Sequence, residues 1–375
     1  MNIDRQLFQK IKNQLFKGKV IILYGARRVG KTTLCKNLIQ EYGDTAEYFN
    51  CDLFVNQRAF GTSDHEKLRT LIGDKKLIIL DEAQTIPKIG QTLKILVDTY
   101  PEIQVIATGS SSFDLANKTG EPLVGRARTY MMYPLALSEV INELGPIESE
   151  AKLNSIFRFG LMPSVFNKYE QESKEELNDI TSKYLYKDIL EFEQVKNPAI
   201  LTDLLRALAF QVGNEVSLRE LANLLKINPA TVARYIDLLE KTFVIFKLRS
   251  FSRNLRKELG KSFKIYFWDL GIRNTLIENY NDLELRNDVG AMWENFCIAE
   301  RLKKNSYERR FVNTYFWRTY DQKEIDYIEE SDGVLRTFEF KSGKSKSKIP
   351  TEFLETYKNS TFEIINRENY HQFLV

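Results

Sequence analysis

Short apolar runs alternate with amphipathic segments of helical length through the first third of the chain. Val20 to Leu23 and Leu77 to Leu80 are continuous apolar runs, Ile103 to Ala107 is largely apolar, and Ala46 to Asp52 is a further strand candidate. Strands buried on both faces give such runs, and their alternation with helices is typical of βαβ units. The pattern predicts an α/β fold with a doubly wound, mostly parallel sheet.

The first 19 residues predict a short amphipathic helix, because charged residues interrupt their apolar positions at Asp4, Lys10, Lys12 and Lys17. The same charges are not expected in the apolar core of a signal peptide. No run elsewhere approaches 18 apolar residues, so the sequence predicts neither a membrane-spanning helix nor a membrane partner.

A pair of capped helices is predicted just beyond the midpoint of the chain. Ser217 and Glu220 have the spacing of a capping box that opens the first helix, and an Asn-Pro pair caps the second. An apolar stripe on the second helix leaves Thr231 and Arg234 facing outward. With the strand expected from Phe243 to Leu248, this order is typical of a winged helix-turn-helix, in which the two outward residues could contact DNA. Such a fold can equally serve for packing alone.

The last quarter of the chain predicts a helix, a hairpin and a further strand, at residues 290–300, 315–328 and 335–341 respectively. On the last strand, period-two alternation places Glu339 and Lys341 on one face. A carboxylate and an amine therefore point toward the same side of the sheet.

Composition narrows the classes of function. The 375 residues include 54 Lys and Arg against 51 Asp and Glu, a formal charge of +3, so any nucleic-acid surface must come from local clusters of basic residues. The only histidines, His65 and His371, argue against a polyhistidine metal centre. Three widely spaced cysteines argue against a disulfide framework or a zinc ribbon, so we expect a reducing, cytoplasmic setting.

A phosphate-binding loop is predicted directly after the first strand. Residues 25–32 read GARRVGKT, the pattern G-x-x-x-x-G-K-[ST], between an apolar run and a helix-forming segment. In this context backbone N–H groups surround phosphate, Lys31 reaches the β- and γ-phosphates, and the Thr32 hydroxyl binds Mg²⁺. The predicted nucleotide-binding residues of the loop are Gly25, Ala26, Arg27, Arg28, Val29, Gly30, Lys31, Thr32 and Thr33.

Two carboxylates, Asp81 and Glu82, follow the predicted strand that ends at Leu80. An acidic residue in this position can hold Mg²⁺ through water, which suits Asp81, and Glu82 can orient and polarise an attacking water. Such carboxylates can instead cap the following turn. A P-loop roughly 50 residues upstream favours the catalytic interpretation.

Hydroxyl groups end the next predicted strand. In a parallel sheet the carboxyl end of a strand borders the ligand crevice. Ser110, or alternatively Thr108, could therefore sense the γ-phosphate. A simple polar turn explains these hydroxyls equally well.

A family resemblance is carried by the motifs GARRVGKTT, LIILDEAQ and VIATGSSS and by the segments at 123–126 and 133–139. Together they are similar to those of prokaryotic AAA-type ATPases that carry a C-terminal endonuclease-like domain. The resemblance implies a P-loop AAA-type fold and binding and hydrolysis of Mg-ATP by Lys31, Thr32, Asp81 and Glu82.

The same resemblance makes Arg126 a candidate for contact with phosphate, in its own subunit or in a neighbouring one of a homo-oligomer. A solvated surface arginine is the alternative, since arginine is mostly exposed in proteins. The helical segments between Lys152 and Glu193 are expected to cap the ATPase core as a lid.

A basic cluster lies between residues 247 and 264, where seven Lys and Arg accompany a single acid, Glu258. Interleaved aromatic residues suit this cluster to a phosphate backbone, although a solvated face explains it as well. DNA is thus the expected partner of residues 217–264 and of the C-terminal domain. Further basic residues that could add to the surface are Lys303, Lys304, Arg309, Arg310, Lys344, Lys346 and Lys348.

A second centre is predicted near the C-terminus. With Asp326 on the adjacent strand, Glu339 and Lys341 complete a D…E-x-K constellation, in which two carboxylates can hold Mg²⁺ and the lysine orients or deprotonates the attacking water. Glu294 could complete the metal site from the preceding helix. The pattern resembles the restriction-endonuclease-like nucleases, although an E-x-K triplet also occurs on exposed strands.

Two functional hypotheses are compatible with these motifs. In the first, an ATP-driven enzyme acts on DNA and its C-terminal site cuts or holds the strand. In the second, an ATP-regulated switch binds a protein partner, and its nuclease-like domain is catalytically inactive. The predicted domains are a P-loop ATPase at 1–148, a helical lid at 149–199, a winged helix-turn-helix at 200–255 and an α/β nuclease-like domain at 256–375, with a hinge from Pro146 to Glu150.

Overall fold

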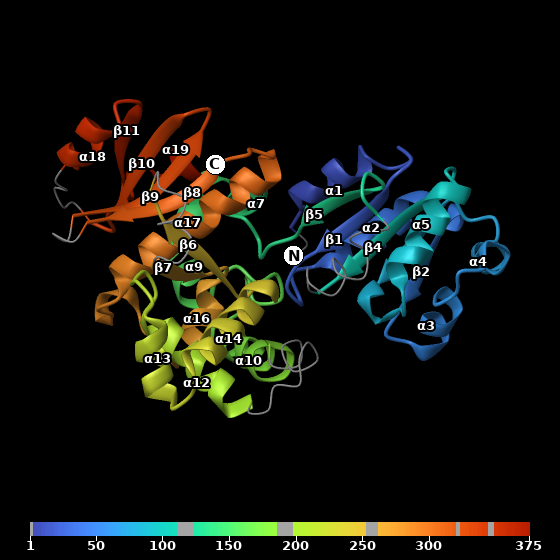
Figure 1. Cartoon of the computed structure of the whole chain (residues 1–375), viewed down its shortest axis with the longest axis horizontal. Helices are drawn as coiled ribbons and strands as arrows, with labels where there is room; N and C mark the ends of the chain where they lie inside the picture. Colours follow the sequence, from blue (N-terminus) through green and yellow to red (C-terminus); the bar gives the residue numbers. More distant parts are fainter. Residues whose placement is uncertain (1–2, 111–122, 186–197, 253–261, 320–322, 344–348) are drawn as a thin grey trace. The chain divides into compact units, whose positions relative to one another are not determined.

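The fold is described from a computed structural model of the chain, which is drawn in Figure 1. The structure describes residues 3–110, 123–185, 198–252, 262–319, 323–343 and 349–375. It divides into two compact units. The N-terminal unit consists mainly of Met1–Pro134, and the C-terminal unit comprises most of the remaining chain.

The N-terminal unit contains a five-stranded sheet in the order β2-β3-β4-β1-β5, and each neighbouring pair is parallel. This confirms the predicted parallel sheet, with small differences at the strand ends. The strands are β1 Val20–Tyr24, β2 Ala46–Asn50, β3 Leu77–Asp81, β4 Gln104–Gly109 and β5 Ala127–Met131. The helices are α1 Gln6–Lys12, which confirms the amphipathic helix, α2 Lys31–Tyr42, α3 Phe54–Phe60, α4 His65–Ile72 and α5 Ile89–Thr99, with 3₁₀ turns η1 Gly43–Thr45 and η2 Ala83–Thr85.

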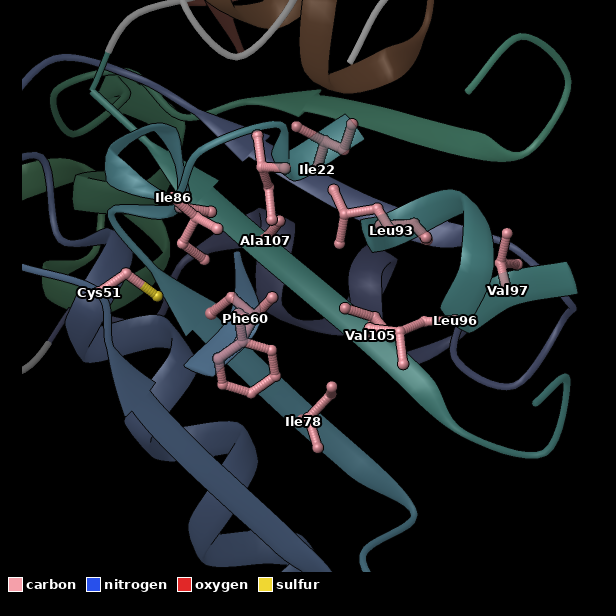
Figure 2. Close-up of a cluster of buried hydrophobic side chains, with 14 of the residues drawn as sticks. Ile22, Cys51, Phe60, Ile78, Ile86, Leu93, Leu96, Val97, Val105 and Ala107 are labelled. Atoms are coloured by element: carbon pink, nitrogen blue, oxygen red, sulfur yellow. The ribbon is translucent and has the colours of Figure 1, made fainter. Parts of the chain in front are cut away.

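A hydrophobic core lies on one face of this sheet. Figure 2 shows Ile22, Ile78 and Val105 from three strands together with Leu93 and Leu96 of α5. These residues alternate along their strands with others that are equally buried, because α2 contacts β2 and β3 on the opposite face. Burial on both faces is the reason that the strands read as continuous apolar runs.

The C-terminal unit contains a six-stranded mixed sheet in the order β11-β10-β9-β8-β6-β7. The β8–β9 pair is antiparallel and confirms the predicted hairpin, whose turn residues Asp321 and Gln322 lie outside the described residues. The strands are β6 Ile245–Ser250, β7 Phe263–Phe267, β8 Asn313–Arg318, β9 Glu324–Ser331, β10 Val334–Phe340 and β11 Ser360–Ile365.

The described residues of the C-terminal unit also form helices. They are α7 Leu137–Leu144, α8 Pro146–Ala151, α9 Leu153–Phe159, α10 Glu170–Asp179, η3 Ile180–Leu185, α12 Pro198–Phe210, α13 Leu218–Leu225, α14 Pro229–Lys241, α16 Leu270–Leu276, η4 Leu283–Leu285, α17 Val289–Glu308, α18 Thr351–Thr356 and α19 Tyr370–Leu374. In this part of the chain, as in the other described residues, no helix combines the length and the apolar character that crossing a bilayer requires.

The expected hinge from Pro146 to Glu150 is wrong, because these residues form α8. Proline at the first helical position has a suitable fixed φ and removes an N–H group that would have no partner within the helix. It therefore begins a helix here instead of interrupting the chain.

The two capped helices are confirmed as α13 and α14. Ser217 Oγ accepts a hydrogen bond from the Glu220 N–H at 3.3 Å, and Asn228 Oδ1 accepts one from the Ala230 N–H at 2.8 Å. The apolar stripe of α14 is buried, and Arg234 is exposed. The strand that follows, β6, begins at Ile245 and not at Phe243.

Candidate functional sites

The loop of residues 25–30 connects β1 to α2 and requires glycine at both ends. A Cβ atom at Gly25 would lie 2.2 Å from the Met132 carbonyl oxygen, and Gly30 has a φ of +101°, which other residues rarely adopt. Gly30 is also the N-cap residue of α2, and no side chain caps that helix. The first N–H groups of α2 therefore remain suited to an anion such as phosphate.

Lys31 begins α2, and its side chain turns back into this loop. Its Nζ donates hydrogen bonds to the carbonyl oxygens of Gly25 at 2.8 Å and Ala26 at 2.9 Å, and the residue is only 5% exposed. Both acceptors are neutral. These two hydrogen bonds therefore hold the ammonium group inside the loop without neutralising its charge. Phosphate binding requires a positive charge in this position.

Asp81 ends β3 and accepts hydrogen bonds from three hydroxyl groups. Thr32 Oγ1 of α2 donates to Oδ2 at 2.8 Å, Tyr48 of β2 donates to the same oxygen at 2.5 Å, and Thr108 Oγ1 of β4 donates to Oδ1 at 2.5 Å. Burial and the bond to Asp81 raise the pKa of Tyr48, so its hydroxyl remains a donor. The Thr32 hydroxyl and the Asp81 carboxylate are the hard oxygen donors that Mg²⁺ prefers, and they are adjacent.

Glu82 follows Asp81 in a left-handed backbone conformation, with a φ of +55°. Its N–H donates to Thr108 Oγ1 at 3.1 Å, and its Oε2 accepts from Gln84 Nε2 at 2.5 Å. Gln84 Nε2 also lies 3.4 Å from Ser110 Oγ. A non-glycine residue at positive φ is costly and is often found at functional sites. The structure thus links Glu82 and Ser110 through Gln84.

The structure also places Arg5, which the sequence analysis missed, against the phosphate-binding loop. Nη1 donates to the Val29 carbonyl oxygen at 2.5 Å, and Nη2 donates to the Tyr133 carbonyl oxygen at 2.7 Å. One guanidinium thereby fastens the loop to the segment that follows β5. Tyr48 was missed in the same way, since only the fold brings it to Asp81, whereas Gln84 lies two positions after Glu82 and its contact there is local.

Arg126 does not contact the phosphate-binding loop of its own chain. Its carbonyl oxygen accepts from the Val20 N–H at 2.9 Å, which places Arg126 at the amino end of β1, whereas the loop follows the carboxyl end. Its side chain pairs with Asp98 at 2.7 Å and is 40% exposed. The structure thus favours the surface-arginine alternative over a phosphate contact within the same subunit, and a contact with phosphate in a neighbouring subunit stays a prediction.

A second centre in the C-terminal unit surrounds a cavity of about 560 Å³ between α17 and the ends of β9 and β10. The predicted residues Glu294, Asp326 and Lys341 line it. The remaining lining residues are Gly290, Phe340, Ser342 and Gly343.

Asp326 is buried on β9 at this cavity. Its Oδ2 accepts a hydrogen bond from the Phe340 N–H at 2.8 Å. Burial, together with the nearby charges of Glu294 and Glu339, raises the pKa of Asp326 well above its usual value. Lys341 Nζ lies 2.7 Å from Glu339 Oε1, which confirms that these two side chains share one face of β10 and the residue after it.

Lys264 was expected on a DNA-binding surface, and the structure corrects this. The residue is 2% exposed, and its Nζ lies 3.1 Å from Glu294 Oε1 and 2.5 Å from Glu324 Oε1. Burial alone would lower the pKa of Lys264, but the two glutamates raise it above its usual value. Tyr266 also donates a hydrogen bond of 2.5 Å to Glu294 Oε1. The sequence around Lys264 did not predict its ion pairs, because its neighbours are basic and its acidic partners are distant in sequence.

The three predicted metal ligands Asp326, Glu339 and Glu294 do not form a ready three-ligand site. Among the described residues, no group of three or more His, Cys, Asp or Glu side chains is arranged to hold a metal ion. Glu294 is instead engaged by Lys264 and Tyr266. Asp326 and Glu339 still fit Mg²⁺, which is commonly bound through one or two carboxylates while it keeps several waters.

Other basic residues of the expected DNA surface are also engaged. Lys303 is 1% exposed and pairs with Glu300 at 2.7 Å, and Lys247 pairs with Glu240 at 2.8 Å. Arg310 pairs with Glu308 at 2.6 Å, and Lys304 donates to the Val375 carbonyl oxygen. Outside the described residues lie Arg253, Arg256, Lys257, Lys261, Lys344, Lys346 and Lys348.

Family models cover most of the chain. Residues 17–141 match a model described as an AAA domain, residues 150–283 a domain of unknown function (DUF8612), and residues 289–370 another (DUF4143). The first match agrees with the AAA-type P-loop resemblance that the sequence motifs carry.

Relatives in other organisms share most of the chain. An uncharacterized protein of Mycobacterium tuberculosis is 28% identical over 349 residues, which are 92% of this chain and 75% of that protein. An uncharacterized protein of Methanocaldococcus jannaschii is 25% identical over 334 residues, 80% of this chain and 74% of that protein.

Two solved structures resemble the fold weakly. The RuvB Holliday junction branch migration motor of Thermotoga maritima has a TM-score of 0.32 and 16% identity, covering 65% of this chain and 90% of its own. The Aeropyrum pernix ORC2 protein in its ADP form has a TM-score of 0.32 and 15% identity, covering 74% and 93%. Scores this low do not establish a shared architecture.

Proposed function

We propose that the N-terminal unit binds and hydrolyses Mg-ATP. The observation that carries this proposal is the pairing of the Thr32 hydroxyl with the Asp81 carboxylate beside a loop that encloses the Lys31 ammonium. Hydroxyl, carboxylate and ammonium are the groups that hold the metal and the phosphates in P-loop enzymes. Bound Mg²⁺ would neutralise charge on the transferred phosphoryl group.

The residues of the loop and of the strand ends have separate roles in this proposal. Lys31 exchanges the Gly25 and Ala26 carbonyl oxygens for phosphate oxygens. Thr32 and Asp81 hold the metal. Glu82 orients and polarises the attacking water. Gln84, which contacts both Glu82 and Ser110, would sense the γ-phosphate together with Ser110.

Two substitutions separate binding from turnover. Lys31→Ala should weaken nucleotide binding roughly 10- to 100-fold, since hydrogen bonds to charged groups contribute about 1.5–3 kcal/mol. Glu82→Gln should bind ATP normally and lose turnover by about 100-fold or more, since a positioned base contributes at least that factor. Lys94→Ala, an exposed lysine of α5, is the control. Binding is measured calorimetrically and turnover as phosphate release. Wild-type turnover in Glu82→Gln would remove that residue from the mechanism.

We further propose that the C-terminal centre cleaves a phosphodiester bond in DNA with a divalent metal. The cavity bordered by Asp326 and Lys341, with Glu339 paired to that lysine, supports this reaction. Asp326 and Glu339 would hold the metal, and Lys341 would orient the attacking water. Arg234, exposed on α14, and Thr231 would position DNA in a winged helix-turn-helix.

This second activity has its own test. Asp326→Ala and Lys341→Ala should abolish Mg²⁺- or Mn²⁺-dependent cleavage of DNA while ATP turnover persists. Arg336→Ala, an exposed arginine on β10, is the matched control. A protein that neither binds DNA at low salt nor cuts it would instead support the alternative, an ATP-regulated switch whose C-terminal unit binds a protein partner.

A further inference from the structure

Lys264 is a buried cation inside the C-terminal centre, and the proposed cleavage reaction assigns it no role. The residue lies on β7, beside Leu248 of β6, and its ammonium reaches away from that edge toward α17 and the start of β9. The inference below rests on the metal-dependent reaction proposed for this centre.

The ammonium bridges two carboxylates. Nζ lies 3.1 Å from Glu294 Oε1 and 2.5 Å from Glu324 Oε1, and 5.4 Å from the centre of the Phe316 ring. Tyr266 supplies a further hydrogen bond to the same oxygen of Glu294. A buried ammonium is unfavourable unless it is paired and hydrogen-bonded, and here two acids and an aromatic face pair with it. A cation that bridges two carboxylates occupies the position in which a metal ion would otherwise bridge them.

The charge of the centre limits how many metal ions it can hold. Among the described residues it contains four carboxylates, Glu294, Glu324, Asp326 and Glu339, and two ammonium groups, Lys264 and Lys341. Two negative charges remain when all six groups are ionised, which one divalent cation neutralises. A second divalent ion would leave two excess positive charges in a partly buried site, which is unfavourable, whereas without Lys264 it would leave one.

We propose that Lys264 takes the place of a second metal ion, so that the centre binds a single divalent cation at Asp326 and Glu339. Lys264 is a positioning residue in this arrangement, because it holds Glu294 and Glu324 away from the bound ion. Its removal would leave these two glutamates free to bind a second ion.

The number of bound Mn²⁺ ions tests this assignment without any measurement of cleavage. Mn²⁺ is titrated into the full-length, nucleotide-free protein and followed by electron paramagnetic resonance. Ions that disappear in Asp326→Ala belong to the C-terminal centre. The unmodified chain should lose one ion on this substitution. Lys264→Met should hold two at the centre, because Glu294 and Glu324 are released from their ion pairs. Lys264→Arg keeps the charge and should hold one.

A matched control is Lys247→Met on neighbouring β6, whose lysine pairs with Glu240 and Asp237, and it should hold one ion. Two ions in the unmodified chain, or one ion in a folded Lys264→Met protein, would overturn the inference while the proposed metal-dependent reaction stands. No ion at the centre of the unmodified chain would overturn that reaction itself. If Lys264→Met does not fold, Lys264→Gln replaces it, and the count for the unmodified chain still decides between one ion and two.

Discussion

The two candidate centres both contain a buried aspartate and a buried lysine, but the partners of the lysines differ in charge. Asp81 accepts hydrogen bonds from the hydroxyl groups of Thr32, Tyr48 and Thr108, and Lys31 donates to two backbone carbonyls. In the C-terminal centre, Lys264 and Lys341 are each paired with glutamate.

Neutral hydrogen-bond partners stabilise a charge without cancelling it, whereas an ion pair cancels it. The hydrogen bonds given above for Lys31 and Asp81 in the N-terminal centre are all to neutral groups, which is compatible with the nucleotide binding proposed for it. The C-terminal centre is largely balanced within itself, which leaves a limited charge for an added ion. The lysines thus contact neutral carbonyl groups in one unit and carboxylates in the other.

A third buried carboxylate, Glu329 on β9, extends the comparison to a purely structural ion pair. Arg301 holds it through Nε at 2.8 Å and Nη2 at 2.7 Å, and Glu329 is 1% exposed. Arg301→Met should lower the free energy of unfolding by about 3–5 kcal/mol, because it leaves a buried charge unpaired. Chemical denaturation at neutral pH measures this, and Arg336→Met, on the exposed side of β10, should stay within about 0.5 kcal/mol.

The pH dependence of that loss identifies its cause. Burial alone would raise the pKa of Glu329, but Arg301 lowers it below its usual value. The pair therefore stabilises the fold above the unfolded pKa of about 4.3, and this stabilisation disappears as the pH falls through the lower native pKa. The difference between Arg301→Met and the unmodified chain should shrink in acid. A difference below about 1 kcal/mol at pH 7 would show that the pair is not structural.

The contrast between Asp81 and Asp326 is tested by replacing each with asparagine. Asp81→Asn should lower the free energy of unfolding by about 1–3 kcal/mol. The amide group of the asparagine would face a hydroxyl that now donates to Asp81, and that hydroxyl would lose its acceptor. Asp326→Asn should leave the stability at pH 7 unchanged or raise it. Burial and the charges of Glu294 and Glu339 raise the pKa of Asp326, so its ionised form is unfavourable in the native state.

The sign of the Asp326 effect follows from its raised pKa. In the unmodified chain, the contribution of Asp326 is fully present below its usual pKa of 3.8 and is lost as the pH rises through the native pKa. Asp326→Asn should flatten this fall when unfolding is measured from acid to neutral pH. A loss of stability equal to that of Asp81→Asn would remove the distinction between the two centres.

The sequence predicts best those elements whose geometry is determined by residues close together in the chain. The parallel strands follow from continuous apolar runs, and the phosphate-binding loop follows from adjacent residues whose spacing is fixed by the chain. The E-x-K pair is also local, since two positions separate Glu339 from Lys341 along β10 and its end. For these features the sequence contains nearly all of the geometry.

The features that sequence analysis missed depend on contacts between distant residues. The Arg5 guanidinium donates hydrogen bonds to residues 24 and 128 positions away in the sequence. Lys264 pairs with Glu294, from which it is separated by 30 positions. In the sequence, Lys264 belongs to a basic cluster and predicts a solvated face. Its burial appears only when β7 and α17 are packed together.

Tyr48 gives the smallest expected effect and tests whether the hydroxyls around Asp81 are structural or catalytic. Tyr48→Phe removes one of two hydrogen bonds to Asp81 Oδ2 and should cost about 0.5–1.5 kcal/mol of stability. Thr32 still donates to the same oxygen. Because one donor is gone, that oxygen carries more unshared negative charge, and the Mg²⁺ concentration that gives half-maximal ATP turnover should fall or stay the same.

The control is Tyr42→Phe on α2, whose ring packs on Phe16 at a centroid distance of 5.7 Å. Turnover in Tyr48→Phe should stay within about threefold of the unmodified chain, which corresponds to roughly 0.7 kcal/mol. A raised Mg²⁺ requirement, or a loss of turnover as large as that expected for Glu82→Gln, would show that the Tyr48 hydroxyl itself takes part at the metal. In that case Asp81 would share its metal-holding role with a neutral side chain that no local sequence pattern marks.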